Sequence, residues 1–269
     1  MTQIALLPER RLIEVKGPDA RPFLHNLLSQ DIETLTPGVL RYGALLTPPG
    51  RLLYDLFVLG TDDGVVLDAP AANADDLLRR LTMYRLRAKV EIAASGLSVH
   101  AVWDGEAAAA LPDPRVPGLG SRLYGEANAN ATEADWRVHC LALGVADPAI
   151  DAPADTTYPI EANLDLLNAI DFHKGCFVGQ ETTSRMKRRG TIKNRMLTLT
   201  FDGPPPPFGA EVLLNGDRRA GEVRGGIDGM ATALLRLDRI DGELTVDGRP
   251  VSVLRPAWLP AALPTDPAG

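Results

Sequence analysis

The sequence contains little cysteine and no long apolar run. Its 269 residues include two cysteines, too few for a disulfide framework in a chain of this size. No hydrophobic segment approaches the roughly 20 residues that a membrane-spanning helix needs. Residues 1–8 lack the pattern of a secretory signal or of a transit peptide. We therefore expect a protein of the reducing cytoplasm that does not associate with membranes.

Positive charge is also scarce, because 28 Lys and Arg residues face 35 Asp and Glu residues and the net charge is −7. A protein that binds DNA non-specifically is usually basic, so we expect no direct DNA binding. One local run has six basic residues and no acid: Arg185, Lys187, Arg188, Arg189, Lys193 and Arg195. Two interpretations remain open, a solvated helix end and strand start, or an anion site for phosphates, RNA or a polyglutamate tail.

Hydrophobic periodicity predicts mixed helices and strands before residue 195. The expected strands are 10–16, 40–47, 51–60, 65–67, 88–93 and 97–103. The expected helices are 19–29, 72–84 (with Met83 among its inward residues), 132–144 and a short one within 158–173. Pro48-Pro49-Gly50 indicates a hairpin, and Thr132 with Asp135 indicates a capping box.

From residue 196 onward the pattern changes to short strands separated by Gly and Asp turns. This spacing is typical of a small barrel or sandwich. We therefore divide the chain into an α+β region, 1–195, and an all-β domain, 196–269, whose last residues, 260–269, we expect to be frayed.

The octapeptide Lys174-Gly175-Cys176-Phe177-Val178-Gly179-Gln180-Glu181 is the most informative segment. It places a thiol between two glycines, one residue from a lysine, before a predicted helix that starts near Gln180. The positive end of a helix and a nearby cation both favour thiolate over thiol. The alternative is a small buried hydrophobe. Cys140 lies on an apolar helical pattern without these features, and we predict that it belongs to the core.

The octapeptide resembles the K-G-C-[FY]-x-G-Q-E signature of the YgfZ family of folate-binding proteins. The resemblance extends to residues 159–168, Arg185 and Arg189-Gly190. Residues 23–31, Gly38, Tyr42 and Gly50 resemble the same family and its larger relative, the T-protein of the glycine cleavage system. The similarity covers nearly the whole chain, and the cysteine signature is its most specific part.

The resemblance implies an α+β fold of the T-protein type. It has two interleaved subdomains, a folate cavity and a small C-terminal antiparallel β-barrel. The family supports assembly or repair of iron–sulfur proteins, including enzymes that modify tRNA. The implied ligand is tetrahydrofolate or another folate, with a shared iron–sulfur cluster. The implied partners are an A-type scaffold protein and client iron–sulfur enzymes.

The resemblance also suggests which side chains have a functional role. Cys176 would act as nucleophile or iron ligand, and Lys174 would favour its anion or simply face water. The expected folate contacts are Asp55, Tyr42, Glu161, Asn163, Gln180, Glu181, Arg185 and Arg189. Helix capping is the alternative role of Glu161, Asn163, Gln180 and Glu181. His25, His100 and His139 are expected to be structural or surface residues, and His173 is weak evidence for a metal.

One departure from the T-protein bears on its chemistry. Where that enzyme has a paired Asp-Asp-Leu, this chain has Tyr54-Asp55-Leu56. A folate-dependent aminomethyl or one-carbon transferase is therefore the alternative function, and a non-catalytic accessory protein is the preferred one. A thiol enzyme is a third hypothesis, but the sequence reveals no His–acid pair for it.

Overall fold

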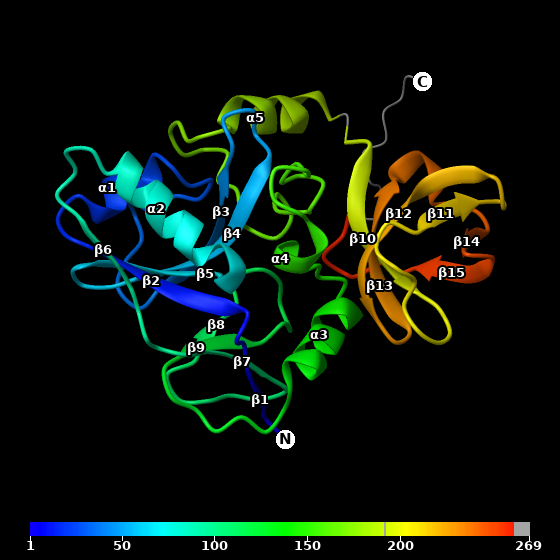
Figure 1. Cartoon of the computed structure of the whole chain (residues 1–269), viewed down its shortest axis with the longest axis horizontal. Coiled ribbons are helices and arrows are strands. Elements are labelled where there is room, and N and C mark those ends of the chain that lie inside the picture. Colours follow the sequence, from blue (N-terminus) through cyan, green and yellow to red (C-terminus); the bar gives the residue numbers. More distant parts are fainter. Residues whose placement is uncertain (191, 261–269) are drawn as a thin grey trace.

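The computed structural model describes residues 1–190 and 192–260 (Figure 1). A five-stranded antiparallel sheet has the order β3-β4-β5-β2-β6. Its strands are β2 (Arg10–Lys16), β3 (Leu40–Leu46), β4 (Leu52–Gly60), β5 (Gly64–Pro70) and β6 (Glu91–Ala94). Helices α1 (Ala20–His25) and α2 (Ala74–Tyr84) share a buried hydrophobic cluster with this sheet.

A second sheet shows that the two subdomains are interleaved. It has the order β1-β7-β9-β8 and pairs the start of the chain, β1 (Gln3–Leu6), with β7 (Val99–Trp103). The other strands are β8 (Leu111–Pro112) and β9 (Ser121–Tyr124). Because β1 pairs with β7, the whole five-stranded sheet is inserted between two neighbouring strands.

The C-terminal strands close into an antiparallel barrel in the order β10-β13-β12-β11-β14-β15. The strands are β10 (Asn194–Thr200), β11 (Glu211–Leu214), β12 (Arg218–Ile227), β13 (Met230–Arg236), β14 (Leu244–Val246) and β15 (Arg249–Val253). The predicted α+β fold followed by a small barrel is confirmed. The expected boundary after residue 195 falls inside β10, and residues 261–269 lie outside the described residues.

Along the chain, α3 (Glu133–Ala142), α4 (Pro148–Asp151) and α5 (Gln180–Arg189) come between β9 and β10. In Figure 1, α3 and α4 lie on the side of the barrel, whereas α5 lies at the top, beside the end of β3 and β4. Single 3-10 turns occur at Ala71–Asn73 and Leu237–Arg239. The capping box at the start of α3 is present, with the Thr132 hydroxyl accepting from the Asp135 backbone N–H at 3.2 Å. No helix among the described residues is long and apolar enough to cross a membrane.

Three local predictions are wrong. Residues 160–168 form successive turns instead of a helix, because Asn163 and Asn168 have left-handed backbones with φ of 61° and 57°. Helix α1 ends at His25, well before residue 29. Met83 is 61% exposed, because it lies two residues from Leu81 on a helix whose buried face contains Leu77 and Leu81.

Candidate functional site

A central cavity of about 410 Å³ lies where the two sheets, α3, α4 and the barrel meet. Strand β12 of the barrel contributes Ile227 to its wall. The charged side chains that line the cavity are Glu9, Arg10, Asp55, Arg115, Arg122, Glu133, Arg137 and Asp147. Donors and acceptors of hydrogen bonds therefore both face a volume suited to a small organic molecule.

Asp55 belongs to a buried ionic network on the wall of this cavity. Arg10 Nη1 lies 3.1 Å from its carboxylate, and Arg10 Nε donates to Asp68 at 2.7 Å. Arg122 Nη1 donates to the other oxygen of Asp68, also at 2.7 Å. Burial raises the pKa of Asp55, and the neighbouring arginines oppose that rise. The network holds the carboxylate in a fixed position beside the cavity.

Tyr42 is the other residue of this sheet that we expected to contact folate, and it contacts Asp55 instead. Its hydroxyl lies 3.4 Å from Asp55 Oδ2, and its ring packs 4.7 Å from that of Phe57. Burial raises the pKa of Tyr42 well above its ordinary value. Tyr42 is not among the residues that line the cavity. It therefore orients the carboxylate and does not contact the cavity itself.

Several cavity residues had no signal in the sequence, including Glu133, Arg137 and Asp147. They are charged residues near the starts of short helices or on helix faces that the sequence pattern predicts to be exposed. Only the folding of α3 and α4 against the sheet brings them to Asp55. Cys140 also lines the cavity and is buried as predicted, and burial raises the pKa of its thiol to about 12.

The second candidate region is the thiol loop, which we define as residues 171–179. Cys176 in this loop is exposed, whereas its neighbour Phe177 is buried. Helix α5 begins at Gln180 with Gly179 as its N-cap, so Cys176 lies four residues before the first helical residue. The expected display of the sulfur is confirmed, but the thiol is not within the first turn of the helix.

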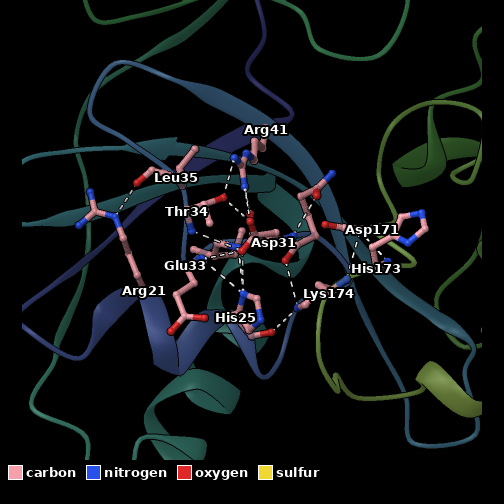
Figure 2. A network of polar contacts seen from close by, with 12 residues as sticks. Arg21, His25, Asp31, Glu33, Thr34, Leu35, Arg41, Asp171, His173 and Lys174 are labelled. Carbon is pink, nitrogen blue, oxygen red and sulfur yellow. Dashed lines mark hydrogen bonds and ion pairs between the residues drawn. The ribbon is translucent and has the colours of Figure 1, made fainter.

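Lys174 braces the thiol loop against the chain after α1 (Figure 2). Its Nζ donates to the carbonyl oxygens of Leu28 at 2.6 Å and Gln30 at 3.1 Å, and to that of His25. Burial lowers the pKa of Lys174 to about 8, although Asp31 and Asp171 act to raise it. The ammonium group thus donates its three protons to hydrogen bonds with backbone carbonyls. Lys174 therefore matches neither a lysine that simply faces water nor one that serves only to favour the thiolate.

A histidine–carboxylate pair lies beside the same loop, contrary to the expectation that no such pair exists. His25 Nδ1 is 2.9 Å from Asp31 Oδ1 (Figure 2). Burial acts to raise the pKa of Asp31, but hydrogen bonds from Thr34 and Arg41 outweigh it and lower this pKa to about 2. His25 and Asp31 lie within the segment that resembles the T-protein, but their contact with a loop much later in the chain had no sequence signal.

Glu161 and Asn163 attach the turns at 160–168 to the barrel. Asn163 is buried and donates to Met196 O at 2.6 Å, while its oxygen accepts from Arg195 Nη1 at 2.9 Å. Glu161 accepts from the Tyr158 N–H at 3.0 Å and from Asn194 Nδ2 at 3.1 Å. Neither side chain lines the cavity. Their polar atoms serve the fold at this junction.

The predicted contacts on α5 also lie outside the cavity. Gln180 and Glu181 make no side-chain cap, because the N-cap residue is Gly179. Arg185 is exposed, and the side chain of Arg189 lies outside the described part of the chain. The basic run does not form one surface, because Arg195 is buried 2.9 Å from Asp165.

Two family descriptions match parts of the chain. Residues 9–113 match the GCVT N-terminal domain, and residues 193–261 match the CAF17 C-terminal beta-barrel domain. The chain is therefore similar to T-protein-related proteins in its N-terminal part and to CAF17-type barrels in its C-terminal part. Its fold is similar to the crystal structure of glycine cleavage system aminomethyltransferase T from Bartonella henselae, with a TM-score of 0.78 and 18% identity over 96% of this chain and 86% of that chain.

The chain is also similar to curated proteins named iron-sulfur cluster assembly factor IBA57. The human protein is 29% identical over 94% of this chain and 84% of its own length, and the Pyricularia oryzae homologue is 29% identical over 92% and 75%. The Phaeosphaeria nodorum homologue is 34% identical over 74% of this chain and 55% of its own. All three are named as mitochondrial, which contradicts the expected cytoplasmic location.

Proposed function

We propose that this chain is a folate-binding accessory protein for iron–sulfur cluster assembly or repair that acts through Cys176. The names of the IBA57 relatives support the cluster-assembly part of the proposal. The observation that carries it is the position of Cys176, an exposed sulfur on a braced loop outside the cavity. A partner protein can reach the thiol there while the cavity holds a small molecule.

The thiol loop suits a cluster in transit rather than a resident one. A thiolate binds iron, but a single cysteine does not hold a cluster alone. Within residues 1–190 and 192–260, no group of three or more His, Cys, Asp or Glu side chains is placed to hold a metal ion. The remaining ligands would come from an A-type scaffold protein or from glutathione, and client iron–sulfur enzymes would receive the cluster.

The cavity residues fit a folate. The volume of about 410 Å³ is typical of a small-molecule site. Asp55 and Glu133 provide carboxylates that accept hydrogen bonds from the N–H edge of a pterin. Arg122 Nε is buried and makes no hydrogen bond within the described residues, and its nearest printed partner, Asp113 Oδ2, lies 3.7 Å away. A bound tetrahydrofolate would supply a reduced pterin that carries one-carbon units, and these side chains would bind and orient it.

Cluster transfer tests the role of Cys176. The chain is incubated anaerobically with iron, sulfide and an A-type scaffold protein, and the activity of an apo iron–sulfur enzyme is then measured. We expect Cys176→Ser to abolish the gain in activity, because the cluster loses its ligand on this chain. Cys140→Ala is the matched control and should retain transfer, because that thiol is buried. Equal transfer by wild type and Cys176→Ser would refute the role of the thiol.

Calorimetry with tetrahydrofolate tests the cavity. Glu133→Gln should weaken binding about tenfold, the scale of one hydrogen bond to a charged group. Glu181→Gln is the matched control, because Glu181 is exposed on α5 and does not line the cavity. An equal loss in both variants, or no binding by the wild type, would argue against a folate in this cavity.

A tetrahydrofolate-dependent aminomethyl or one-carbon transferase is the second candidate, favoured by the T-protein fold. Tyr54 argues against a transferase, because it replaces a carboxylate of the T-protein. Its hydroxyl donates a hydrogen bond to Asp76 of α2. Measurable turnover in a standard aminomethyl-transfer assay would favour this alternative over the accessory role.

A further inference from the structure

Three carboxylates on the wall of the central cavity have no cationic partner. They are Glu9, Glu133 and Asp147. Within residues 1–190 and 192–260, no Lys, Arg or His forms an ion pair with any of them. Asp147 accepts the backbone N–H of Ala149 at 3.0 Å, whereas the side chains of the other two accept no hydrogen bond in this part of the chain. The cavity wall therefore has carboxylates that are left without a counter-charge.

The four arginines of the wall are each held by an aspartate. Arg115 Nη2 lies 2.8 Å from Asp113 Oδ2, and Arg137 Nη2 lies 2.7 Å from Asp151 Oδ1. The other two belong to the buried network described above, which contains two further aspartates. Asp147 also attracts two of these arginines at longer range, but their charges are already balanced. Four positive charges thus meet four paired carboxylates, and the three unpaired ones leave an excess of negative charge in the cavity.

The unpaired carboxylates lie near one another on the outer side of the cavity. Glu9 is exposed, and Glu133 and Asp147 are half-buried, whereas the arginine network is buried. Burial raises the pKa of Glu133, and the charges of Glu9 and Asp147 raise it further. A positive charge that enters beside them relieves this repulsion, because an opposite charge stabilises an ionised carboxylate.

The rest of the lining limits the kind of cation that fits. No group of three or more His, Cys, Asp or Glu side chains in the described part of the chain is placed to hold a metal ion, so the three carboxylates do not form a compact coordination site. Most of the other lining residues are apolar, and they include Trp136, Ala146 and Ile227. Apolar side chains and dispersed negative charge together favour an aromatic organic cation over an inorganic ion.

We propose that the cavity selects a folate whose pterin end is positively charged over a neutral folate. The inference rests on the proposed function, because it concerns the ligand of the same cavity. Methenyltetrahydrofolate meets this description, since one carbon joins two of its nitrogens in a flat amidinium cation. Folinic acid carries the same carbon as a formyl group on one nitrogen and is neutral at that position. The unpaired carboxylates attract the amidinium, whereas the formyl amide gains no such attraction.

Calorimetry with these two ligands tests the selection. Both are used as monoglutamates, so they differ in charge at the pterin and share the same tail. We expect methenyltetrahydrofolate to bind at least about tenfold more tightly, because partly buried charges attract more strongly than exposed ones. Added salt should reduce this ratio of affinities. The absorbance band of the methenyl form confirms that it stays intact during each titration.

Glu9→Gln combined with Asp147→Asn removes two of the charges and keeps the shapes of both side chains. The ratio of affinities should fall toward one in this double variant, while the affinity for folinic acid changes little. Glu181→Gln is the matched control and should keep the wild-type ratio, because Glu181 is exposed on α5 and does not line the cavity. Circular dichroism confirms that each variant is folded.

Two results would overturn the charge selection alone. They are equal affinities for the two ligands in the wild type, and the wild-type ratio in the folded double variant. Either result would leave folate binding in place, so the two proposals fail separately. Binding of neither ligand by the wild type would refute both.

Discussion

Cys176 and Cys140 are the same residue type in two environments. Cys176 is exposed in a loop whose fold depends on Lys174 and on the buried Phe177. Cys140 is 5% exposed on the inner face of α3, where burial raises the pKa of its thiol to about 12. We therefore expect Cys176 to be the more reactive thiol and Cys140 to contribute more to stability.

Alkylation and unfolding should separate the two cysteines. Iodoacetamide should modify Cys176 in the native protein and leave Cys140 untouched until the chain unfolds, which mass spectrometry of peptides can read. Cys176→Ser should change the free energy of unfolding by less than about 1 kcal/mol, the usual scale outside the core. Cys140→Ser should cost roughly 1–3 kcal/mol, because it buries a hydroxyl. Rapid native modification of Cys140, or a large cost at Cys176, would reverse these assignments.

At the scale of elements, α5 packs closely around its N-cap, Gly179, and has open space around its C-cap, Gly190. Both ends have glycines with left-handed backbones, Gly179 with φ of 80° and Gly190 with φ of 65°. The start of the helix packs on the tip of the β3–β4 hairpin, where a β-carbon on Gly179 would lie 2.6 Å from Thr47 O and 2.9 Å from Gly50 Cα. This contact sets the direction in which the chain passes from the thiol loop into α5.

The two glycines allow a matched comparison. Gly190→Ala should cost about 1–2 kcal/mol of unfolding free energy, because the left-handed backbone is strained while no atom of the described residues lies within 4 Å of the new carbon. Gly179→Ala should cost about 1–3 kcal/mol more, because the hairpin must also move. Urea unfolding of both variants measures the difference. Equal costs would show that the hairpin does not restrict the start of α5.

At the scale of the whole molecule, the barrel is attached through a buried ionic junction. Arg195 of β10 is 2% exposed, and its guanidinium donates to Asp165 at 2.9 and 3.0 Å and to the Ile160 carbonyl at 2.9 Å. Lys187 approaches the same Asp165 at 3.5 Å. The barrel thereby joins the turns at 160–168, and its strand β12 contributes Ile227 to the wall of the central cavity.

Breaking this junction should destabilise the protein strongly. Arg195→Met should lower the free energy of unfolding by roughly 3 kcal/mol, the lower range for removing one partner of a buried pair, because Lys187 still compensates part of the Asp165 charge. Arg188→Met, an exposed change in the same basic run, should stay within about 0.5 kcal/mol. Denaturant titration checks both. A small effect at Arg195 would mean that the barrel is held mainly by apolar packing.

The sequence was sufficient for the features that depend on near neighbours. The Pro48-Pro49-Gly50 hairpin, the capping box of α3 and the strands of the barrel follow from turn residues and periodicity, which act over a few residues. The display of Cys176 also followed from its flanking glycines. The failure at residues 160–168 has a local cause as well, since left-handed asparagines interrupt a pattern that otherwise predicts a short helix within 158–173.

Tertiary structure alone decided how the candidate residues are grouped. Asp55 meets Arg10 and Glu133 across a cavity, while Lys174 and Cys176 lie on a separate loop beside His25. These neighbours come from segments far apart in the chain, and they meet because β1 pairs with β7 around an inserted sheet and the barrel closes against the turns at 160–168. Local sequence sets which face of an element is apolar, but the partner of each polar side chain depends on which distant element covers that face.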